Sequence, residues 1–235
     1  MTTGEIDRRV SPTGQRGTLQ AALWDMDGLL VDTEPIWTVA EEELAQRLGG
    51  SWDLDLKARI VGTRLEVAVP TILEWYGLAP TVQAVSDASN WLLVRMVELF
   101  EGEVRVLPGV TRLLDELARE QVPVALVSSS YRPLVDAVLR RGLATFGVTV
   151  AGDEVRQGKP HPEPYLTACR LLGADPRHCV VIEDSHAGIA SGEAAGCSVV
   201  AVPSVPGVVV EPAARRLVTQ SLETVDVTML RELVA

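Results

Sequence analysis

The pattern of apolar and polar residues divides the sequence into three stretches. Residues 19–24 form a short, mostly apolar run, which is typical of a buried strand. Between residues 36 and 100, apolar residues recur at helical spacing, and Gly49 and Gly77 stand where helices in this stretch would end. From residue 104 onward, short apolar runs alternate with segments of helical period. The sequence therefore predicts a strand, then a wholly helical stretch, then alternating strands and helices.

The alternating stretch predicts the framework of the fold. We expect strands over residues 122–127, 148–151, 179–182, 198–202 and 217–218. We expect helices over residues 110–117, 134–139, 165–172, 187–195 and 227–233. Short strands that are apolar throughout and separated by helices are typical of a parallel sheet buried on both faces. The predicted fold class is α/β, a Rossmann-like parallel sheet covered by helices on both faces, with an inserted all-helical cap domain.

The same pattern predicts where the domains divide. Residues 18–34 and 105–235 would form the α/β core, and residues 35–104 would form the helical cap. Pro35 and residues 104–107 would be the linkers between the two. Residues 1–17 are polar and lack the apolar segment of a signal peptide, so we interpret them as a disordered leader.

Composition and charge exclude several classes of function. The net charge of −11 argues against non-specific binding to nucleic acid, which requires a basic surface. No apolar run approaches the ~18 residues that a membrane-spanning helix needs. The three cysteines show no CxxC spacing and fit small buried apolar positions in a reducing compartment. We expect a cytoplasmic protein, a monomer or small homo-oligomer, that binds neither nucleic acid nor membranes.

Polar residues follow the predicted strands, at the edge where an open α/β sheet binds its ligands. They are Asp25 and Asp27 after residues 19–24, Ser128 and Ser129 after residues 122–127, and Glu183 and Asp184 after residues 179–182. Lys159 stands in an intervening loop, between Gly158 and Pro160. Phosphoryl transfer needs a nucleophile, a proton donor and groups that neutralise the phosphoryl oxygens. Carboxylates that hold Mg²⁺, hydroxyl donors and one lysine together meet these needs.

The segment DMDG at residues 25–28 resembles the DxDG loop of phosphatases in the haloacid dehalogenase superfamily. The segment DTEP at residues 32–35 is similar to the sugar-phosphatase and β-phosphoglucomutase branch of that superfamily. Ser128 matches the second motif of the superfamily, Lys159 the third, and Glu183 with Asp184 the acidic fourth. The resemblance covers about residues 19–234, nearly the whole chain.

The resemblance implies a role for each of these residues. Asp25 would be the nucleophile that forms an aspartyl-phosphate, and Asp27 the general acid that protonates the leaving alcohol and then activates water. Asp25, the main-chain carbonyl of Asp27 and Asp184 would hold Mg²⁺, and Glu183 would ligate it directly or through water. The substrate phosphate would be bound by the remaining motif residues, which are Ser128, Ser129 and Lys159.

The helical stretch carries one further candidate site. Gly62 and Arg64 lie in a glycine-containing turn that would reach the substrate, as cap loops of the superfamily do. An ordinary turn between two helices is the alternative interpretation.

The function implied by the resemblance is a Mg²⁺-dependent phosphatase of a small phosphomonoester, a sugar phosphate, with the helical cap closing over the site. A β-phosphoglucomutase is the first alternative. The mutase branch carries a histidine shortly after the DxDG loop, where this sequence has Trp37. A non-catalytic module that binds phosphorylated metabolites is the alternative of another class. Its sequence would be expected to have lost Asp25, Asp27, Lys159 or Asp184, and all four are present.

Overall fold

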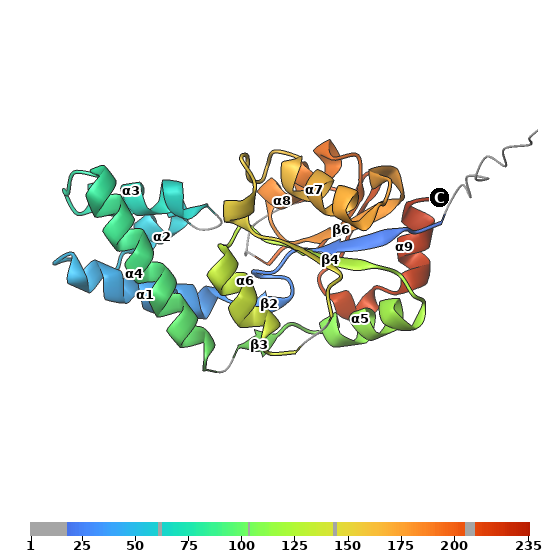
Figure 1. Cartoon of the computed structure of the whole chain (residues 1–235), viewed down its shortest axis with the longest axis horizontal. Coiled ribbons are helices and arrows are strands. Elements are labelled where there is room, and N and C mark those ends of the chain that lie inside the picture. Colours follow the sequence, from blue (N-terminus) through green and yellow to red (C-terminus); the bar gives the residue numbers. More distant parts are fainter. Residues whose placement is uncertain (1–17, 61–62, 103, 143–144, 205–209) are drawn as a thin grey trace, which may run out of the picture.

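The computed structural model describes residues 18–60, 63–102, 104–142, 145–204 and 210–235. At its centre lies a six-stranded sheet in the order β5-β4-β1-β6-β7-β8, in which every neighbouring pair is parallel (Figure 1). The strands are β1 (Ala21–Trp24), β4 (Val124–Val127), β5 (Val148–Val150), β6 (Cys179–Glu183), β7 (Ser198–Ala201) and β8 (Arg216–Val218). The central strand β1 is buried on both faces, which explains its uninterrupted apolar sequence. The predicted α/β class is confirmed.

Along the chain, four helices lie between β1 and β4, the next strand of the sheet (Figure 1). They are α1 (Glu34–Arg47), α2 (Leu54–Ile60), α3 (Leu65–Trp75) and α4 (Val82–Phe100). We call residues 34–100 the helical insert. Their buried side chains, such as Leu44, Ile72 and Leu92, pack against one another and account for the helical spacing of apolar residues. The boundaries of the core and cap domains, at residues 34/35 and 104/105, stay a prediction.

Two short strands connect the helical insert to the core. β2 (Val31–Asp32) and β3 (Arg105–Val106) pair in antiparallel fashion, with Val31 opposite Val106. The two connecting chains therefore run side by side as a ribbon. Pro35 lies in the first turn of α1 rather than in a linker, because proline is compatible with the first helical position.

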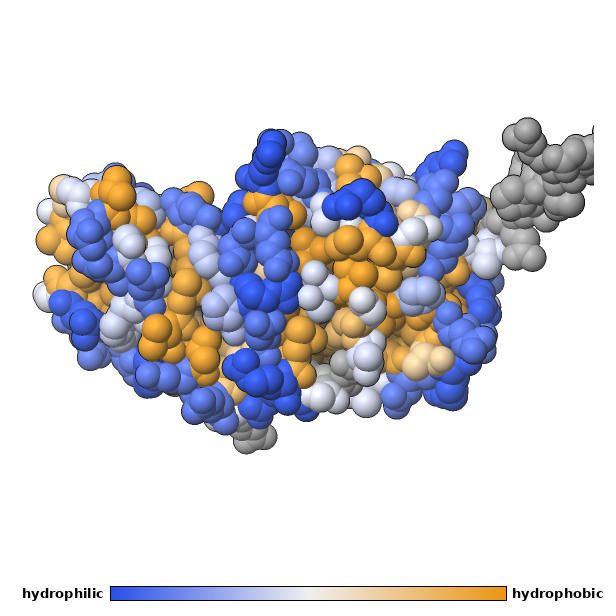
Figure 2. All heavy atoms as spheres, viewed as in Figure 1, coloured by the Kyte–Doolittle hydropathy of each residue, from blue (hydrophilic) through white to orange (hydrophobic). Residues whose placement is uncertain are grey.

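The surface shows polar and apolar side chains mixed over both parts of the molecule, with a notch in the outline between the helical insert and the core (Figure 2). In the described part of the chain, no helix has the length and apolar character to cross a membrane. The expected leader, residues 1–17, lies outside the described residues.

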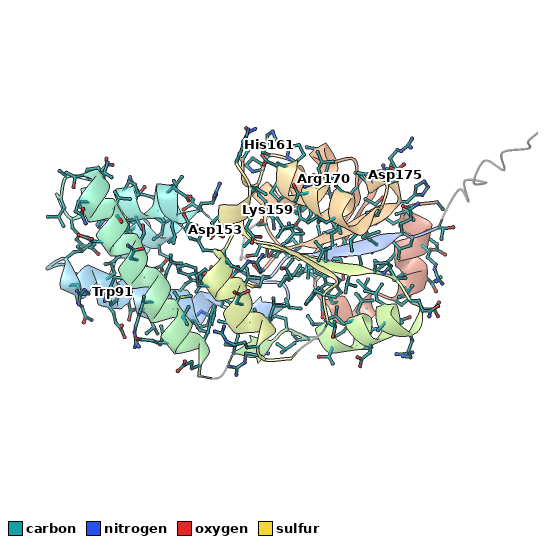
Figure 3. All side chains as sticks on the ribbon, viewed as in Figure 1. Trp91, Asp153, Lys159, His161, Arg170 and Asp175 are labelled. Carbon is teal, nitrogen blue, oxygen red and sulfur yellow. The ribbon has the colours of Figure 1, made fainter. Side chains whose placement is uncertain are left out.

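The carboxyl ends of the strands face the helical insert. Lys159 lies at this edge of the sheet, whereas Asp175 lies at the far end of the core (Figure 3). Residues that follow different strands are thereby gathered in one place, as expected for an open parallel sheet.

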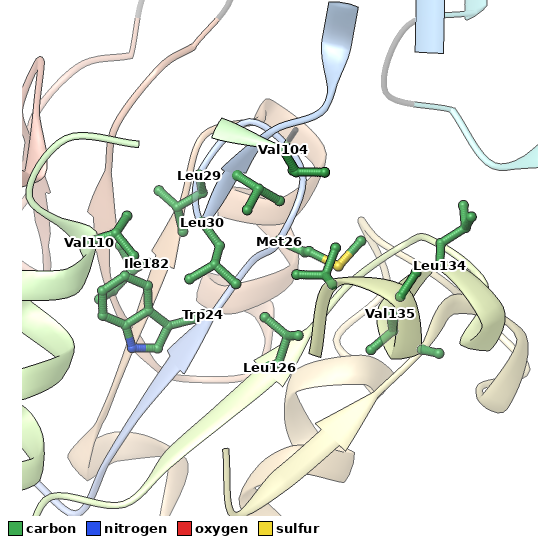
Figure 4. Packing of buried hydrophobic residues seen from close by; sticks show 14 of the residues in the cluster. Trp24, Met26, Leu29, Leu30, Val104, Val110, Leu126, Leu134, Val135 and Ile182 are labelled. Atoms are coloured by element: carbon green, nitrogen blue, oxygen red, sulfur yellow. The ribbon is translucent and has the colours of Figure 1, made fainter. Parts of the chain in front are cut away.

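Helices cover both faces of the sheet. One face packs against α5 (Val110–Arg119), α6 (Arg132–Leu139) and α9 (Val227–Leu233), and the other against α7 (Glu163–Leu172) and α8 (His186–Ala194). Three 3₁₀ turns complete the described elements: η1 (Gly152–Glu154), η2 (Pro176–His178) and η3 (Leu222–Thr224). Alternate residues of β1 point to opposite faces, so Trp24 packs in the first layer with Leu126 and Ile182 (Figure 4), whereas Leu23 packs in the second.

Candidate active site

Lys159 joins the ends of the three central strands. Its Nζ lies 2.5 Å from Oδ1 of Asp25 after β1 and 2.6 Å from Oε1 of Glu183 at the end of β6. It also donates a hydrogen bond to the carbonyl oxygen of Val127 at the end of β4, at 2.9 Å. The side chain is only 4% exposed, so the cation lies in a nearly dry site where its interactions with charges are strong.

Glu183 is held by five hydrogen bonds. Its Oε1 accepts from Lys159 Nζ and, at 2.8 Å, from the hydroxyl of Tyr165. Its Oε2 accepts from the backbone N–H groups of Asp184 and Ser185 and from the hydroxyl of Ser185. The ring of Tyr165 also lies beneath Lys159 Nζ, with the centroid 5.0 Å away. Glu183 therefore fixes Lys159 in place, a function that its sequence position alone does not indicate.

Asp27 is surrounded by hydroxyl groups. Thr33 Oγ1 donates to its Oδ1 at 2.8 Å, and Ser128 Oγ and Ser130 Oγ donate to its Oδ2 at 3.0 and 2.9 Å. Gly28, directly after it, has a φ of +78°, a conformation that glycine adopts without strain and that turns the chain away from the sheet. The carboxyl group of Asp27 is thus oriented by three donors from two separate loops.

Three buried carboxylates crowd beside the lysine. Asp25, Glu183 and Asp184 each offer an oxygen, and these atoms all lie within 4.8 Å of one another. Burial raises the pKa of Asp184 to about 8, with a further contribution from Glu183. Burial also raises the pKa of Asp25 well above its ordinary value, although Lys159 opposes the change.

This arrangement leaves the site short of positive charge. Lys159 stays protonated because Asp25 and Glu183 outweigh the effect of burial and raise its pKa, but it is one cation facing three carboxylates. A set of hard carboxylate oxygens with uncompensated negative charge fits a divalent cation such as Mg²⁺. Asp184 and Asp25 are the better placed ligands, since the oxygens of Glu183 already accept hydrogen bonds from protein donors.

A cavity of about 100 Å³ opens beside Asp27 and runs into the helical insert. Ser129, Ser130 and Tyr131 form its core side, and Trp37 and Arg64 belong to its insert side. Arg64 crosses between the two parts of the molecule: Nη2 donates to the carbonyl oxygen of Gly152 at 2.6 Å and lies 3.3 Å from Glu66. Gly62, the other expected residue of this turn, lies outside the described residues.

Comparison with known proteins identifies the family. A family model described as haloacid dehalogenase-like hydrolase matches residues 19–196. The chain belongs to this family. It is 35% identical over 208 residues to hexitol phosphatase A of Escherichia coli (strain K12), a match that covers 88% of this chain and 93% of that protein.

The chain also matches one longer protein and one solved structure of similar length. The chain is 36% identical over 187 residues to the bifunctional riboflavin kinase/FMN phosphatase of Arabidopsis thaliana, covering 78% of this chain but 48% of that protein. It also superposes on the structure of CbbY from Rhodobacter sphaeroides in complex with phosphate, with a TM-score of 0.78 and 27% identity, covering 88% of this chain and 96% of that one. The predicted family and enzyme class are confirmed.

The structure brings together most of the residues that the sequence singles out. Asp25, Asp27, Ser128, Lys159, Glu183 and Asp184 converge at one edge of the sheet, and Ser129 lines the adjoining cavity. The individual catalytic and binding roles of these residues stay predictions.

Three further residues of the candidate site were not expected from the sequence. Thr33 binds Asp27, Tyr165 binds Glu183, and Ser204 donates to Oδ2 of Asp184. Thr33 lies next to motif residues and could have been found there. Tyr165 carries no such signal, because its position fits the apolar face of a helix.

Proposed function

We propose that this protein is a Mg²⁺-dependent phosphatase that hydrolyses a small phosphomonoester, a sugar phosphate, through an aspartyl-phosphate on Asp25. The observation that supports it most is the contact of Lys159 with both Asp25 and Glu183, with Asp27 turned toward the adjoining cavity. Relatives named as phosphatases of hexitols and of FMN agree with this reaction class.

In the first step, a carboxylate oxygen of Asp25 attacks the phosphorus atom, and the bond from phosphorus to the ester oxygen breaks. Asp27 gives its proton to the leaving alkoxide, which departs as an alcohol. Lys159 offsets the charge of the phosphoryl oxygens. The N–H group of Ser129 donates a hydrogen bond to them, as does the hydroxyl of Ser128, which would turn from Asp27 to the substrate.

In the second step, Asp27 takes a proton from a water molecule, and the hydroxide oxygen attacks the phosphorus atom of the aspartyl-phosphate. The bond to Asp25 breaks, which releases inorganic phosphate and restores both carboxyl groups. Mg²⁺ held by Asp25, the Asp27 carbonyl and Asp184 would supply positive charge to the phosphoryl oxygens during both steps.

Arg64 is proposed to contact the substrate from the helical insert. It lines the cavity, and its Nε is buried without a hydrogen-bond partner among the described residues, so this N–H remains able to donate to a ligand. The insert as a whole would act as a cap that excludes water from the closed site.

A β-phosphoglucomutase remains the second candidate, because the two activities share this core chemistry. Trp37 forms part of the cavity wall, so an indole stands where that branch carries the histidine used in proton control. This position favours hydrolysis over mutase chemistry. A non-catalytic binding module is the less economical explanation, since the site keeps its nucleophile, acid, lysine and metal ligands together.

The experiment that tests the proposal is phosphate release from a panel of phosphomonoesters, with and without Mg²⁺. The Asp25→Asn variant should lose about a thousandfold or more of the activity, because an amide cannot replace the nucleophile. Asp115→Asn, on the exposed face of α5, is the matched control and should keep it. Equal metal-dependent turnover by wild type and Asp25→Asn would refute the nucleophile. Isomerisation of a hexose 1-phosphate that requires a bisphosphate primer would establish the mutase instead.

A further inference from the structure

The cavity beside Asp27 carries a group of charges on its insert side. Lys57 on α2 lies between two glutamates of α1, with its Nζ 2.7 Å from Oε2 of Glu41 and 3.1 Å from Oε2 of Glu34. All three residues line the cavity. The side chains of Lys57 and Glu41 are only 17% and 9% exposed.

The ion pairs of Lys57 join α2 to α1 in a largely apolar part of the cavity wall. Their neighbours in the cavity wall are mainly apolar and include Ile60, Ile72 and Leu92. Burial raises the pKa of Glu41 to about 6 even though Lys57 opposes it, so the charged carboxylate is poorly solvated there. An apolar side chain of similar volume would fill the position without this cost. A buried ion pair retained in an apolar wall points to a ligand.

Glu41 also has unused hydrogen-bonding capacity. Its Oε2 accepts from Lys57, but its Oε1 has no hydrogen-bond partner within the described part of the chain. Lys57 has three N–H groups and two carboxylate partners. The pair thus offers the cavity one free acceptor and one free donor, side by side.

We propose that Glu41 and Lys57 bind hydroxyl groups of the alcohol part of the substrate, and that with Glu34 they select a neutral polyhydroxylated group over one with a second anion. This assignment rests on the proposed phosphatase function and names the substrate class more narrowly: monophosphates of polyols or sugars.

The chemistry of the three residues supports this selection. A hydroxyl group both donates and accepts, so neighbouring hydroxyls match the free acceptor of Glu41 and the free donor of Lys57. Two carboxylates and one ammonium leave a net negative charge, which would repel a second phosphate or a carboxylate. Arg64, the other cation of the wall, is paired with Glu66 and adds no uncompensated positive charge.

A sugar bisphosphate, the primer of a mutase, would bring its second phosphate toward Glu34 and Glu41. The same three residues therefore disfavour mutase chemistry.

The test compares kcat/KM for sorbitol 6-phosphate, fructose 1,6-bisphosphate and acetyl phosphate, whose leaving group carries no hydroxyl group for Glu41 and Lys57 to bind. Wild type should prefer sorbitol 6-phosphate over the bisphosphate. Glu41→Gln and Lys57→Gln should each lower the ratio of sorbitol 6-phosphate to acetyl phosphate turnover by about 10- to 100-fold, from the strength of a hydrogen bond to a charged group. Glu41→Gln should also lower the ratio of kcat/KM for sorbitol 6-phosphate to kcat/KM for fructose 1,6-bisphosphate.

Glu42→Gln is the matched control, since Glu42 is the exposed neighbour of Glu41 on the same helix. Its turnover ratios should equal those of wild type, and thermal melting will verify that each variant is folded. A wild-type preference for the bisphosphate, or unchanged ratios in both Glu41→Gln and Lys57→Gln, would overturn the assignment while phosphatase activity stands. If wild type hydrolyses acetyl phosphate no faster than Asp25→Asn, the proposed function fails and the assignment falls with it.

Discussion

At the scale of single residues, the active site depends on a small number of hydrogen bonds that orient charged groups. Lys159 is positioned by Asp25 and Glu183, and Glu183 in turn by Tyr165 and Ser185. The position of Lys159 therefore depends on the residues that hold Glu183. A donor that never touches the substrate can affect the rate through this chain of contacts.

Tyr165→Phe tests this dependence, because it removes only the hydroxyl that donates to Glu183 and keeps the ring beneath Lys159. We expect kcat to fall about tenfold with little change in KM, and the free energy of unfolding to fall by about 1–3 kcal/mol, the usual result of losing a buried hydrogen bond to a charged group. Steady-state kinetics and urea unfolding measure both. Tyr76→Phe, which removes a hydroxyl bound to Ser51 in the helical insert, should leave kcat unchanged. Wild-type kcat in Tyr165→Phe would contradict the positioning role.

Asp184→Asn tests the charge balance. In the absence of metal, burial raises the pKa of Asp184 to about 8, so the folded protein keeps a proton that the unfolded chain releases near pH 4. The contribution of this residue to stability is therefore lost as the pH rises between about 4 and 8. At pH 7.5 without Mg²⁺, we expect Asp184→Asn to be more stable than wild type in urea unfolding.

Mg²⁺ should reduce this difference. At a metal concentration of 100 times Kd, wild type should gain about 2.7 kcal/mol, whereas the variant, lacking a ligand, should gain much less. An equal gain in both proteins would show that Asp184 does not hold the metal.

Much of the site at this scale could be predicted from the sequence. Asp25, Lys159 and Asp184 stand next to apolar strands or in a short proline-flanked loop, where a polar residue is conspicuous. Tyr165 could not be recognised, because its ring serves the apolar face of α7 and only its hydroxyl serves the site. When one side chain both packs in the core and serves the site, the sequence pattern reveals only the packing.

At the scale of elements, the site requires α8 to approach β6 closely. Gly188 lies in the first turn of α8, and a Cβ at this position would overlap the carboxylate of Glu183. The backbone of the helix can therefore lie against the side chain that fixes Lys159. The close packing thus explains why glycine occupies position 188, even though glycine weakens a helix by about 1 kcal/mol relative to alanine.

Gly188→Ala should consequently lower kcat by about 100-fold or more, since Glu183 must move and Lys159 loses its partner. Kinetics on any accepted phosphomonoester will measure this. Gly147→Ala is the matched control, because the nearest heavy atoms to a Cβ there are 3.8 Å away. If Gly188→Ala retains wild-type kcat, the close approach has no catalytic consequence.

Some helices and strands could be predicted from the sequence and others could not. The helices of the core were found because each is long enough to show a period, as in α5 with Val110, Leu113, Leu114 and Leu117 buried. The strands of the core were found as short apolar runs between these helices. The ribbon of β2 and β3 was not, because a strand of two residues has no period. The helix α2 lies inside the stretch predicted to be helical, but the sequence does not mark it as a separate helix, since seven residues give barely two turns.

At the scale of the whole molecule, the helical insert and the core are joined by more than their two connecting chains. Apolar side chains form one continuous cluster from Trp24 in the sheet to Leu92 in the insert. Arg64 adds a polar contact to Gly152, a residue 88 positions away in the sequence. Such contacts could not be predicted from periodicity, because it describes one segment at a time and does not relate segments to one another.

The ion pair of Glu41 and Lys57 affects both the stability of the molecule and, as proposed, its binding of substrate. The pKa of Glu41 is raised from its ordinary value of 4.5 to about 6, so the folded state holds a proton that the unfolded chain has lost. Wild-type stability should therefore fall as the pH rises from about 4.5 to 6, by up to about 2 kcal/mol for a pKa change of this size. Glutamine has the same shape and no titrating proton.

We accordingly expect Glu41→Gln to gain up to about 2 kcal/mol on wild type between pH 4.5 and pH 7.5, measured as the difference in the free energy of unfolding at each pH. The control Glu42→Gln should show no such gain. If the difference between Glu41→Gln and wild type is constant with pH, Glu41 is not a strained buried carboxylate. A variant that is more stable at neutral pH yet poorer with polyol phosphates would mean that the carboxylate is kept for the substrate, at the expense of the fold.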